Sequence, residues 1–302
     1  MAVLGFEPVV PGVWRLRTLI VNVYAVESED GWTLVDTGPP GVGPWVALAT
    51  MQLFNDVPPK AIVLTHAHFD HASNAKALAE EWNVEVYVHE QERPYVTGQS
   101  DYAPGDPTPG GAMSFLSRAF PRKGFDLGDR VRTFGPNGEI PTMPGWRAIH
   151  TPGHTQGHVS LFRESDRTLI AGDAFTTTDT DSWIDVLLWR KKLSRAPTPF
   201  TPDWRSAEMS VDLLSRLHPV TLAPGHGDPV SSDAIPTELQ RFAETVAPPL
   251  HGRYTLRPAE YAPDGSLADV PPPVPDPLPK KLAVFAAIAI VGIVLIRRAD
   301  RD

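Results

Sequence analysis

The stretch Thr65-His66-Ala67-His68-Phe69-Asp70-His71 decides how this chain is organised. Four residues that can bind a metal ion fall within six consecutive positions of it. The apolar run 61–64 before it is typical of a short buried strand, and residues 72–81 after it are typical of a helix. Imidazole together with carboxylate favours Zn²⁺, Fe or Mn over Mg²⁺ and Ca²⁺, which prefer oxygen ligands alone. A polar turn whose histidines only cap the helix is the alternative, and so dense a cluster of ligands disfavours it.

The spacing His66-x-His68-x-Asp70-His71 resembles the signature of the metallo-β-lactamase superfamily. Three later motifs supply further ligands in that family's order: His154 in 151–155, Asp173 in 171–174 and His226 in 224–227. The resemblance covers about residues 10 to 230. It implies an α/β fold, the four-layered αβ/βα sandwich of this family.

The resemblance also implies how the ligands are shared between two metal ions. It assigns one ion to His66, His68 and His154, the second to Asp70, His71 and His226, and both to a bridging Asp173. The expected cofactor is a pair of Zn²⁺ ions holding a hydroxide between them, with Fe or Mn as alternatives. Asp70 would also orient the hydroxide and pass a proton to the leaving group. Asp36, in the triplet Asp36-Thr37-Gly38, would brace the ligand loop; an ordinary turn aspartate is the alternative.

The function expected from this set is metal-dependent hydrolysis of an ester, thioester or lactone. Asp173 and the lack of cysteine are more similar to glyoxalase II and lactonase enzymes than to most β-lactamases. Quorum-quenching lactonases resemble this chain over 68–72, but they carry a tyrosine three residues after the bridging aspartate, where this chain has Thr176. Two alternatives stay open: a persulfide dioxygenase with a single iron, and a membrane-tethered metal-binding module without turnover.

A small-molecule substrate is expected to contact the region between the third and fourth ligand motifs. The residues predicted to form an apolar pocket there are Phe175, Trp183, Ile184, Trp189 and Phe200. The basic run 190–192 could meet an anionic group, although a solvated basic turn is the alternative. Residues 98–145 are rich in Pro and Gly and are predicted to form part of the pocket rim, because long irregular segments in compact domains are usually functional.

Composition limits the remaining choices. The 302 residues carry a formal net charge of -9, which argues against a nucleic-acid-binding surface. The chain has no cysteine, so disulfides and thiolate ligands are excluded. His89 is predicted as a packing residue at the end of a strand and His158 as a polar residue at the start of one. His150 is predicted to be buried or to support the ligand loop that follows it. The oligomeric state stays open.

The C-terminal region departs from the rest of the chain. We expect a catalytic domain over 1–245, a Pro-rich linker over 246–281 and an apolar segment over 282–296, flanked by Lys280-Lys281 and Arg297-Arg298. As a helix the segment would be about 22 Å long, against about 30 Å of bilayer hydrocarbon. We predict a C-terminal hydrophobic helix that anchors the protein in a membrane, with a docked hydrophobic helix as the alternative. No secretory signal is evident, so the catalytic domain is expected in the cytoplasm, or the whole protein soluble there.

Overall fold

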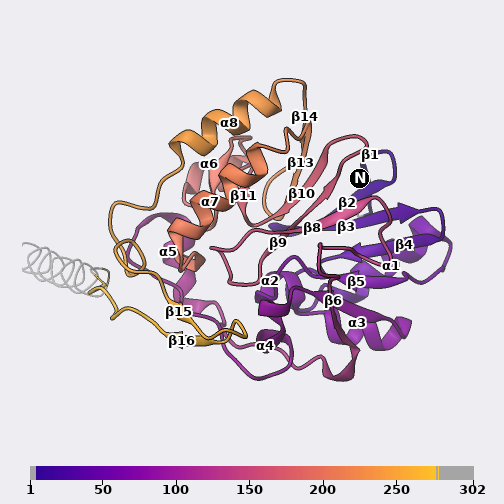
Figure 1. Ribbon diagram of the computed structural model, residues 1–302, viewed down its shortest axis with the longest axis horizontal. Coiled ribbons are helices and arrows are strands. Elements are labelled where there is room, and N and C mark those ends of the chain that lie inside the picture. Colours follow the sequence, from indigo (N-terminus) through magenta and orange to yellow (C-terminus); the bar gives the residue numbers. More distant parts are fainter. Residues whose placement is uncertain (1–4, 277, 279–302) are drawn as a thin grey trace, which may run out of the picture.

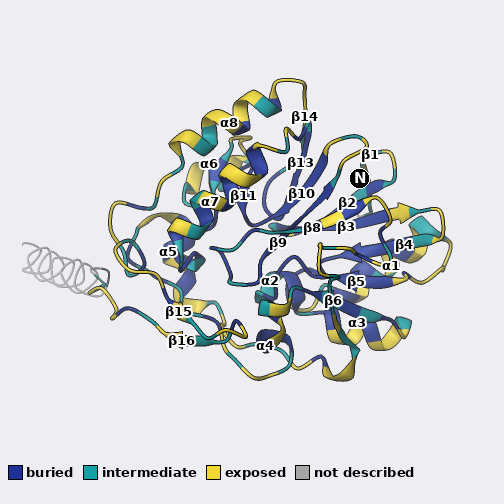
Figure 2. Ribbon diagram, in the orientation of Figure 1, coloured by how far each residue is buried: buried dark blue, intermediate teal, exposed yellow. Residues whose placement is uncertain are grey.

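The computed structural model of the protein describes residues 5–276 and residue 278. Two β-sheets lie face to face in the middle, and helices cover the outer face of each (Figure 1). The predicted α/β fold with four layers is therefore confirmed for the described residues. Buried residues concentrate on the strands and exposed residues on the outward sides of the helices (Figure 2).

The N-terminal half builds the larger sheet. Its strands, in spatial order, are β1 (Glu7–Val10), β2 (Val13–Thr18), β3 (Val21–Ser28), β4 (Gly31–Val35), β5 (Ala61–Val63), β6 (Glu85–Val88) and β7 (Val131–Thr133). Strands β1 to β4 pair antiparallel through short turns, whereas β4 to β7 pair parallel. Helices α1 (Gly43–Phe54) and α3 (Ala75–Trp82) are the crossover connections that bury its outer face.

The C-terminal half builds the smaller sheet. Its spatial order is β14 (Val230–Ser231), β13 (Thr221–Pro224), β10 (Thr168–Gly172), β9 (Val159–Arg163) and β8 (Trp146–His150). Helices α7 (Trp204–Ser215) and α8 (Ile235–Thr245) cover it, and their residues Leu214 and Leu239 are fully buried in the core. Side chains of both sheets, including Val63 and Leu161, form the core between the layers.

Shorter elements lie at the edge of the sheets and near the ligand motifs. They are α2 (Phe69–Ala72), α4 (Arg93–Val96), α5 (Gly111–Leu116), α6 (Trp183–Leu188), η1 (Glu90–Glu92), η2 (Ser117–Ala119), η3 (Gly128–Arg130), η4 (Thr198–Phe200), and the strand pair β11 (Phe175–Thr176) and β12 (Ser194–Arg195). The helix predicted over 72–81 is interrupted, so that α2 and α3 are separate. Asn74 lies at the break, and its side-chain amide donates to the carbonyl oxygens of Thr37, Gly38 and Pro39.

Residues 246–276, which belong to the predicted linker, run along the catalytic domain. They include the pair β15 (Glu260–Tyr261) and β16 (Leu267–Asp269). The Tyr254 hydroxyl donates to the Pro104 carbonyl oxygen at 2.6 Å, and the ring is buried beside Trp204. Over residues 5–276 and 278, no helix has the length and apolar character needed to cross a bilayer. The predicted anchor, residues 282–296, lies outside the described residues.

Candidate metal centre

The predicted metal ligands lie on loops that follow four strands. The motif around His66 follows β5, His154 follows β8, Asp173 follows β10, and His226 follows β13. These strand ends meet at one edge of the two packed sheets, so residues up to 160 positions apart in the chain share one site. Strands β5, β10 and β13 are short and fully buried, which gives their loops a rigid base; β8 is partly exposed.

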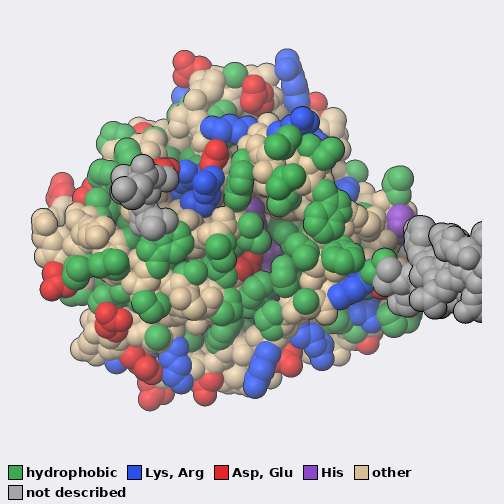
Figure 3. Space-filling model, turned by 180° about the vertical axis from the view of Figure 1, so that it is seen from behind, with side chains coloured by type: hydrophobic (Ala, Val, Ile, Leu, Met, Phe, Trp, Pro, Cys, Tyr) green, Lys and Arg blue, Asp and Glu red, His purple; other side chains and the backbone are tan. Residues whose placement is uncertain are grey.

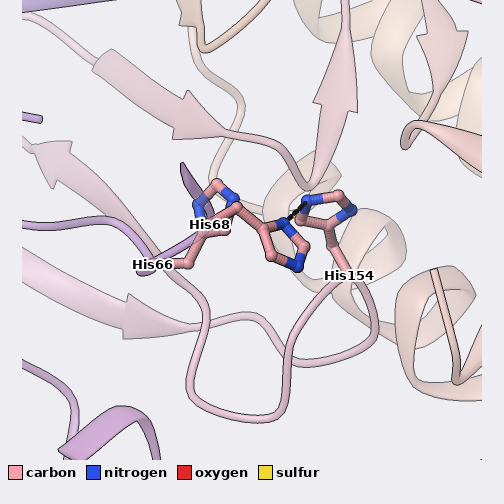
Figure 4. Close-up of side chains that lie close together, drawn as sticks. All are labelled: His66, His68 and His154. Atoms are coloured by element: carbon pink, nitrogen blue, oxygen red, sulfur yellow. Dashed lines mark hydrogen bonds between the residues drawn. The ribbon is translucent and has the colours of Figure 1, made fainter. Parts of the chain in front are cut away.

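The ligand atoms gather in groups whose members lie within 4.8 Å of one another. One group is His66, His68 and His154, and another is Asp70, His71 and His226. They are the two sets that the sequence assigns to separate metal ions. In the first, His68 Nδ1 lies 2.9 Å from His154 Nε2, so two ring nitrogens face a common point (Figure 4).

Asp173 lies between these two groups. Its Oδ2 is 3.5 Å from His154 Nε2 in the first group and 3.1 Å from His226 Nε2 in the second. Its Oδ1 is 3.6 Å from His71 Nε2, and these two residues form a further group with His66. A carboxylate in this position can contact both ions of a pair.

In His71 and His226 the ring nitrogen on the far side from the site, Nδ1, is held by a neighbouring group. His71 Nδ1 lies 2.9 Å from Asp36 Oδ2, and His226 Nδ1 lies 2.9 Å from the Ile20 carbonyl oxygen. Asp36 also accepts from the backbone N–H of Thr65 at 2.8 Å, as expected of a residue that braces the ligand loop. Because Nδ1 is a donor in both rings, Nε2 carries the free lone pair whenever the ring is neutral, and it points into the site.

The first group is kept ready to bind a cation. Burial lowers the pKa of His66 and of His154 well below the ordinary value, and it lowers the pKa of His68 to about 3. Neighbouring histidines lower all three further, because a second positive charge is unfavourable close by. The three rings are therefore neutral at physiological pH, which is the form that binds a metal ion.

The second group has an excess of negative charge. Burial would lower the pKa of His71 and of His226, but the carboxylate of Asp173 raises both above the ordinary value. Burial would likewise raise the pKa of Asp173, but His226 and His71 hold it well below its usual range. Protons on the His71 and His226 rings balance the negative charge of the neighbouring carboxylates. A bound metal ion would supply the same positive charge in their place.

The residues present fit a metal pair. Among the described residues, the buried atoms His66 Nε2, His71 Nε2 and Asp173 Oδ1 have no hydrogen-bond partner. Buried polar atoms are normally paired, and an unsatisfied one costs about 1–3 kcal/mol. All three atoms face the same small region, so bound cations would satisfy them together.

Glu92 is a residue at the site that the sequence analysis missed. Its Oε1 accepts from the Ala67 N–H at 2.9 Å and from the Tyr102 hydroxyl, and its Oε2 accepts from Thr155 Oγ1 at 2.9 Å and the Gly157 N–H at 3.0 Å. Ala67 lies between two predicted ligands and Thr155 follows a third, so one buried carboxylate joins two ligand loops. Burial raises the pKa of Glu92, although its hydrogen bonds act against this shift.

His158 has a comparable role behind Asp173. It was predicted as a polar residue at the start of a strand, and its fully buried Nε2 accepts from the Asp173 N–H at 2.9 Å. Its Nδ1 lies 2.8 Å from Thr151 Oγ1. Burial lowers its pKa to about 3, which keeps Nε2 unprotonated and able to accept. His150, by contrast, stacks on His89 with ring centroids 4.0 Å apart and does not contact the ligands.

A pocket opens directly above the ligands. It is lined by His68, Phe69, Asp70, Tyr102, Ala103, Gly105, Met113, Phe120, Pro121, Arg122, His154, Asp173, Pro197, Phe200 and His226. Phe120 connects its aromatic wall, with ring centroids 5.0 Å from Phe69 and 5.8 Å from Phe200. Many of the lining residues come from 102–122, in agreement with the expected contribution of the irregular segment to the rim.

The predicted substrate contacts are largely elsewhere. Of the five residues predicted to form the pocket, Phe200 lies in its wall. Phe175 is instead fully buried in the core beneath α7, since β11 turns its ring inward. Trp183 and Ile184 are exposed on α6, and Trp189 lies under the Arg17 guanidinium, 4.5 Å from the ring centroid. The basic run 190–192 pairs with aspartates at the surface and agrees with the solvated alternative.

Comparisons with known proteins agree with this geometry. The family model of the metallo-beta-lactamase superfamily matches residues 16–226. The protein YflN of Bacillus subtilis (strain 168), named as a probable metallo-hydrolase, is 38% identical over 248 residues, covering 80% of this chain and 94% of YflN. The uncharacterised protein YobT of the same strain is 31% identical over 239 residues, covering 76% of this chain and 94% of YobT.

Solved structures show the same fold. The crystal structure of TTHA1623 in a di-iron-bound form is 27% identical, with a TM-score of 0.50, and covers 72% of this chain and 92% of that one. A metallo-β-lactamase of Cronobacter sakazakii with a HARLDQ motif has a TM-score of 0.55 at 17% identity, covering 79% and 91%; at this identity the likeness concerns the fold alone.

The chain belongs to the metallo-β-lactamase superfamily. The fold of this superfamily binds divalent metal ions, and the relationship to metallo-hydrolases supports hydrolase activity.

Proposed function

We propose that this protein hydrolyses an ester, thioester or lactone with an apolar acyl group, using two Zn²⁺ ions. The observation that carries the proposal is the position of two groups of metal-binding side chains on the floor of a pocket with aromatic walls. The acyl group would pack against Phe69, Phe120 and Phe200, which brings its carbonyl carbon close to the ligands.

The proposed ligands are the seven residues named from the sequence. His66, His68 and His154 would hold one ion, Asp70, His71 and His226 the other, and Asp173 both. Two divalent ions in such a site lower the pKa of a coordinated water and polarise a carbonyl oxygen.

The chain's own side chains complete the chemistry. Asp70 is partly exposed to the pocket and has its Oδ2 3.5 Å from His226 Nε2, where its carboxylate can orient a water and transfer its proton to a leaving oxygen or sulfur. The aromatic wall keeps bulk water away, which strengthens the electrostatic interactions in the site. Asp36, Glu92 and His158 orient the ligands from behind and do not touch substrate.

Arg122 favours a substrate that also carries an anionic group. It is exposed at the wall of the pocket and makes no ion pair with any described carboxylate. Tyr102 supplies a tyrosine to the pocket lining. Thr176, which stands where quorum-quenching lactonases carry a tyrosine, does not line the pocket; it is buried, and its Oγ1 donates to the Thr178 carbonyl oxygen at 2.7 Å. A glyoxalase II-like or lactonase-like substrate is consistent with this lining.

The proposal is tested by measuring bound metal and turnover together. Purified protein is analysed for metals and assayed on lactones and thioesters with acyl groups of increasing length, and on phosphodiesters. His66→Ala and Asp173→Ala should each lose bound metal and turnover, and the surface variant His251→Ala should keep both.

Three outcomes would contradict the proposal. Turnover by protein stripped of metal would exclude the metal-dependent reaction. One iron per chain with oxygen consumption would favour a persulfide dioxygenase. Bound metal without turnover of any member of the panel would favour a binding module.

A further inference from the structure

Two short helices beside the pocket expose large apolar side chains. They are Trp183, Ile184, Leu187 and Leu188 of α6, and Phe115 and Leu116 of α5. We call these six residues the apolar collar; their exposure ranges from 37% for Leu116 to 77% for Leu187. The rings of Phe115 and Trp183 lie 5.8 Å apart, so the two helices form one surface. Exposed apolar patches of this kind mark interaction sites.

The apolar collar adjoins the mouth of the pocket. Met113, on the same helix as Phe115, lines the pocket. Figure 3 shows hydrophobic side chains gathered around a hollow in which histidine and acidic side chains are visible. A partner that covers the apolar collar would therefore lie next to the entrance of the site.

Cations flank the apolar collar on one side. Arg190, Lys191 and Lys192 follow α6 directly, and their side chains are 59–62% exposed. The aspartates that pair with them are only 14–27% exposed. Positive charge thus points outward here, although the net charge of the chain is -9. A negatively charged partner surface is complementary to this arrangement.

The chain leaves the described structure at the apolar collar. Arg118 lies over the Phe115 ring, 5.7 Å from its centroid, and binds Asp276 at 2.8 Å. From Leu278, four residues lead to position 282, a distance of at most about 14 Å. The sequence 282–296 is apolar without interruption and has basic pairs on both sides.

We propose that the apolar collar docks on the surface of a phospholipid bilayer. Headgroups with negative charge would meet the exposed cations after α6, and the apolar segment 282–296 would enter the same bilayer. A segment that is apolar on every side would still expose much of its surface if it packed on the collar alone, whereas lipid can cover both. Docking of this kind does not depend on which reaction the metal centre catalyses.

Vesicle binding by the full chain tests the docking. We would measure co-sedimentation with phosphatidylcholine vesicles, with and without phosphatidylglycerol. Ile184→Asp/Leu187→Asp places two charges in the apolar collar and should lower the partition coefficient at least about tenfold. The control Leu48→Asp/Met51→Asp changes two similarly exposed residues of α1 and should change it less than about twofold. All four positions are exposed, so circular dichroism and thermal unfolding should match the wild type.

A second variant separates the contribution of the apolar collar to vesicle binding from that of the C-terminal segment. Ile288→Asp/Val291→Asp puts charges into the apolar segment of the full chain and leaves the apolar collar unchanged. Residual vesicle binding should persist in this variant and disappear when Ile184→Asp/Leu187→Asp is added. Brominated lipid should quench wild-type fluorescence more strongly than that of Trp183→Phe.

Several results would overturn the docking. One is equal vesicle binding by collar variants and wild type, with the C-terminal segment intact or substituted. Another is a dimer in vesicle-free solution that the collar variants convert to a monomer, since a second copy would then cover the surface. A third is an increase in acrylamide quenching of tryptophan fluorescence in the Ile288→Asp/Val291→Asp variant without vesicles, if Trp183→Phe abolishes the increase. The segment itself would then be the cover.

Discussion

Glu92 accepts hydrogen bonds from two loops that carry predicted metal ligands. It is fully buried, and its carboxylate is the common acceptor for the loop containing Ala67 and the loop containing Thr155. The Gly157 N–H approaches it closely, and a Cβ at this glycine would lie 2.3 Å from the backbone nitrogen of Glu92. A single side chain thus fixes the spacing of the first metal group without belonging to it.

Replacing Glu92 by glutamine should weaken metal binding. An amide NH₂ group cannot accept, so at least one of the buried donors loses its partner at a cost of about 1–3 kcal/mol. Losses of this kind behind metal ligands typically lower metal affinity about 10- to 100-fold. We expect that drop for Glu92→Gln in a competition titration with a zinc-binding dye.

Glu90→Gln is the matched control, because Glu90 lies on the same short helix and is exposed. It should leave the zinc affinity unchanged. Equal affinities for Glu92→Gln and Glu90→Gln would mean that the carboxylate does not position the ligand loops.

At the scale of the elements, the loop after β13 packs tightly against two of the predicted ligands. A Cβ at Gly225 would lie 2.1 Å from Asp173 Oδ1 and 2.9 Å from His71 Cε1. Both side chains are buried and have little space to move. Gly225→Ala should therefore displace both ligands and lower zinc affinity by at least about tenfold. Isothermal titration of metal-free protein would measure this change.

Gly41→Ala provides the comparison. Its φ of +85° makes alanine unfavourable there, but no atom lies within 4 Å of the added Cβ. It should lower the melting temperature slightly and leave zinc affinity unchanged. If both variants bind zinc like the wild type, the loop after β13 tolerates more displacement than the geometry indicates.

The junction of β6 and η1 should contribute to the loss of folding stability at acidic pH. His89 caps η1 by accepting from the Gln91 N–H at 3.2 Å, and burial and the neighbouring His150 lower its pKa from 6.5 to about 4. Between these values the unfolded chain takes up a proton that the folded chain does not, so stability falls as pH falls. His89→Asn keeps a capping acceptor and removes the titration.

We therefore expect the free energy of unfolding of His89→Asn to depend less steeply on pH between about 6.5 and 4. Urea unfolding of metal-free protein at several pH values would show this, with wild-type protein in parallel. Parallel curves for the two proteins would contradict a half-buried His89 that stays neutral in the folded protein.

For the whole molecule, metal binding should act as a stabilising crosslink between the two halves. The ligands come from loops after β5, β8, β10 and β13, which belong to both sheets. A metal ion whose free concentration is 100 times its dissociation constant adds about 2.7 kcal/mol to the free energy of unfolding. For a domain of this size that corresponds to about 5–10 °C in melting temperature.

Chelation should lower the melting temperature by this amount, and added Zn²⁺ should restore it, as measured by differential scanning fluorimetry. A protein that loses its bound metal on chelation and keeps its melting temperature would contradict the crosslink between the two halves.

The predicted ligands could be named from the chain alone. The unusual spacing around His66 pointed to a family resemblance, and that resemblance located His154, Asp173 and His226. The layered fold was implied by the same resemblance, and the two packed sheets with their covering helices agree with it.

Apart from Asp36, the residues that support the ligand loops could not be predicted from the sequence. Glu92 contacts Ala67 and Thr155, which lie 25 and 63 residues away, and no local pattern connects them.

The pocket wall also depended on packing between distant segments. Phe120 and Phe200 are 80 positions apart, and their rings come together only because η2 and η4 fold over the same site. The apolar residues Trp183 and Ile184 have similar side-chain chemistry and face solvent instead. Local sequence specified the side chains that are predicted to bind metal, because their chemistry and the spacing around His66 are short-range properties. Which apolar side chains enclose them was decided by long-range contacts, since burial is a property of the assembled layers.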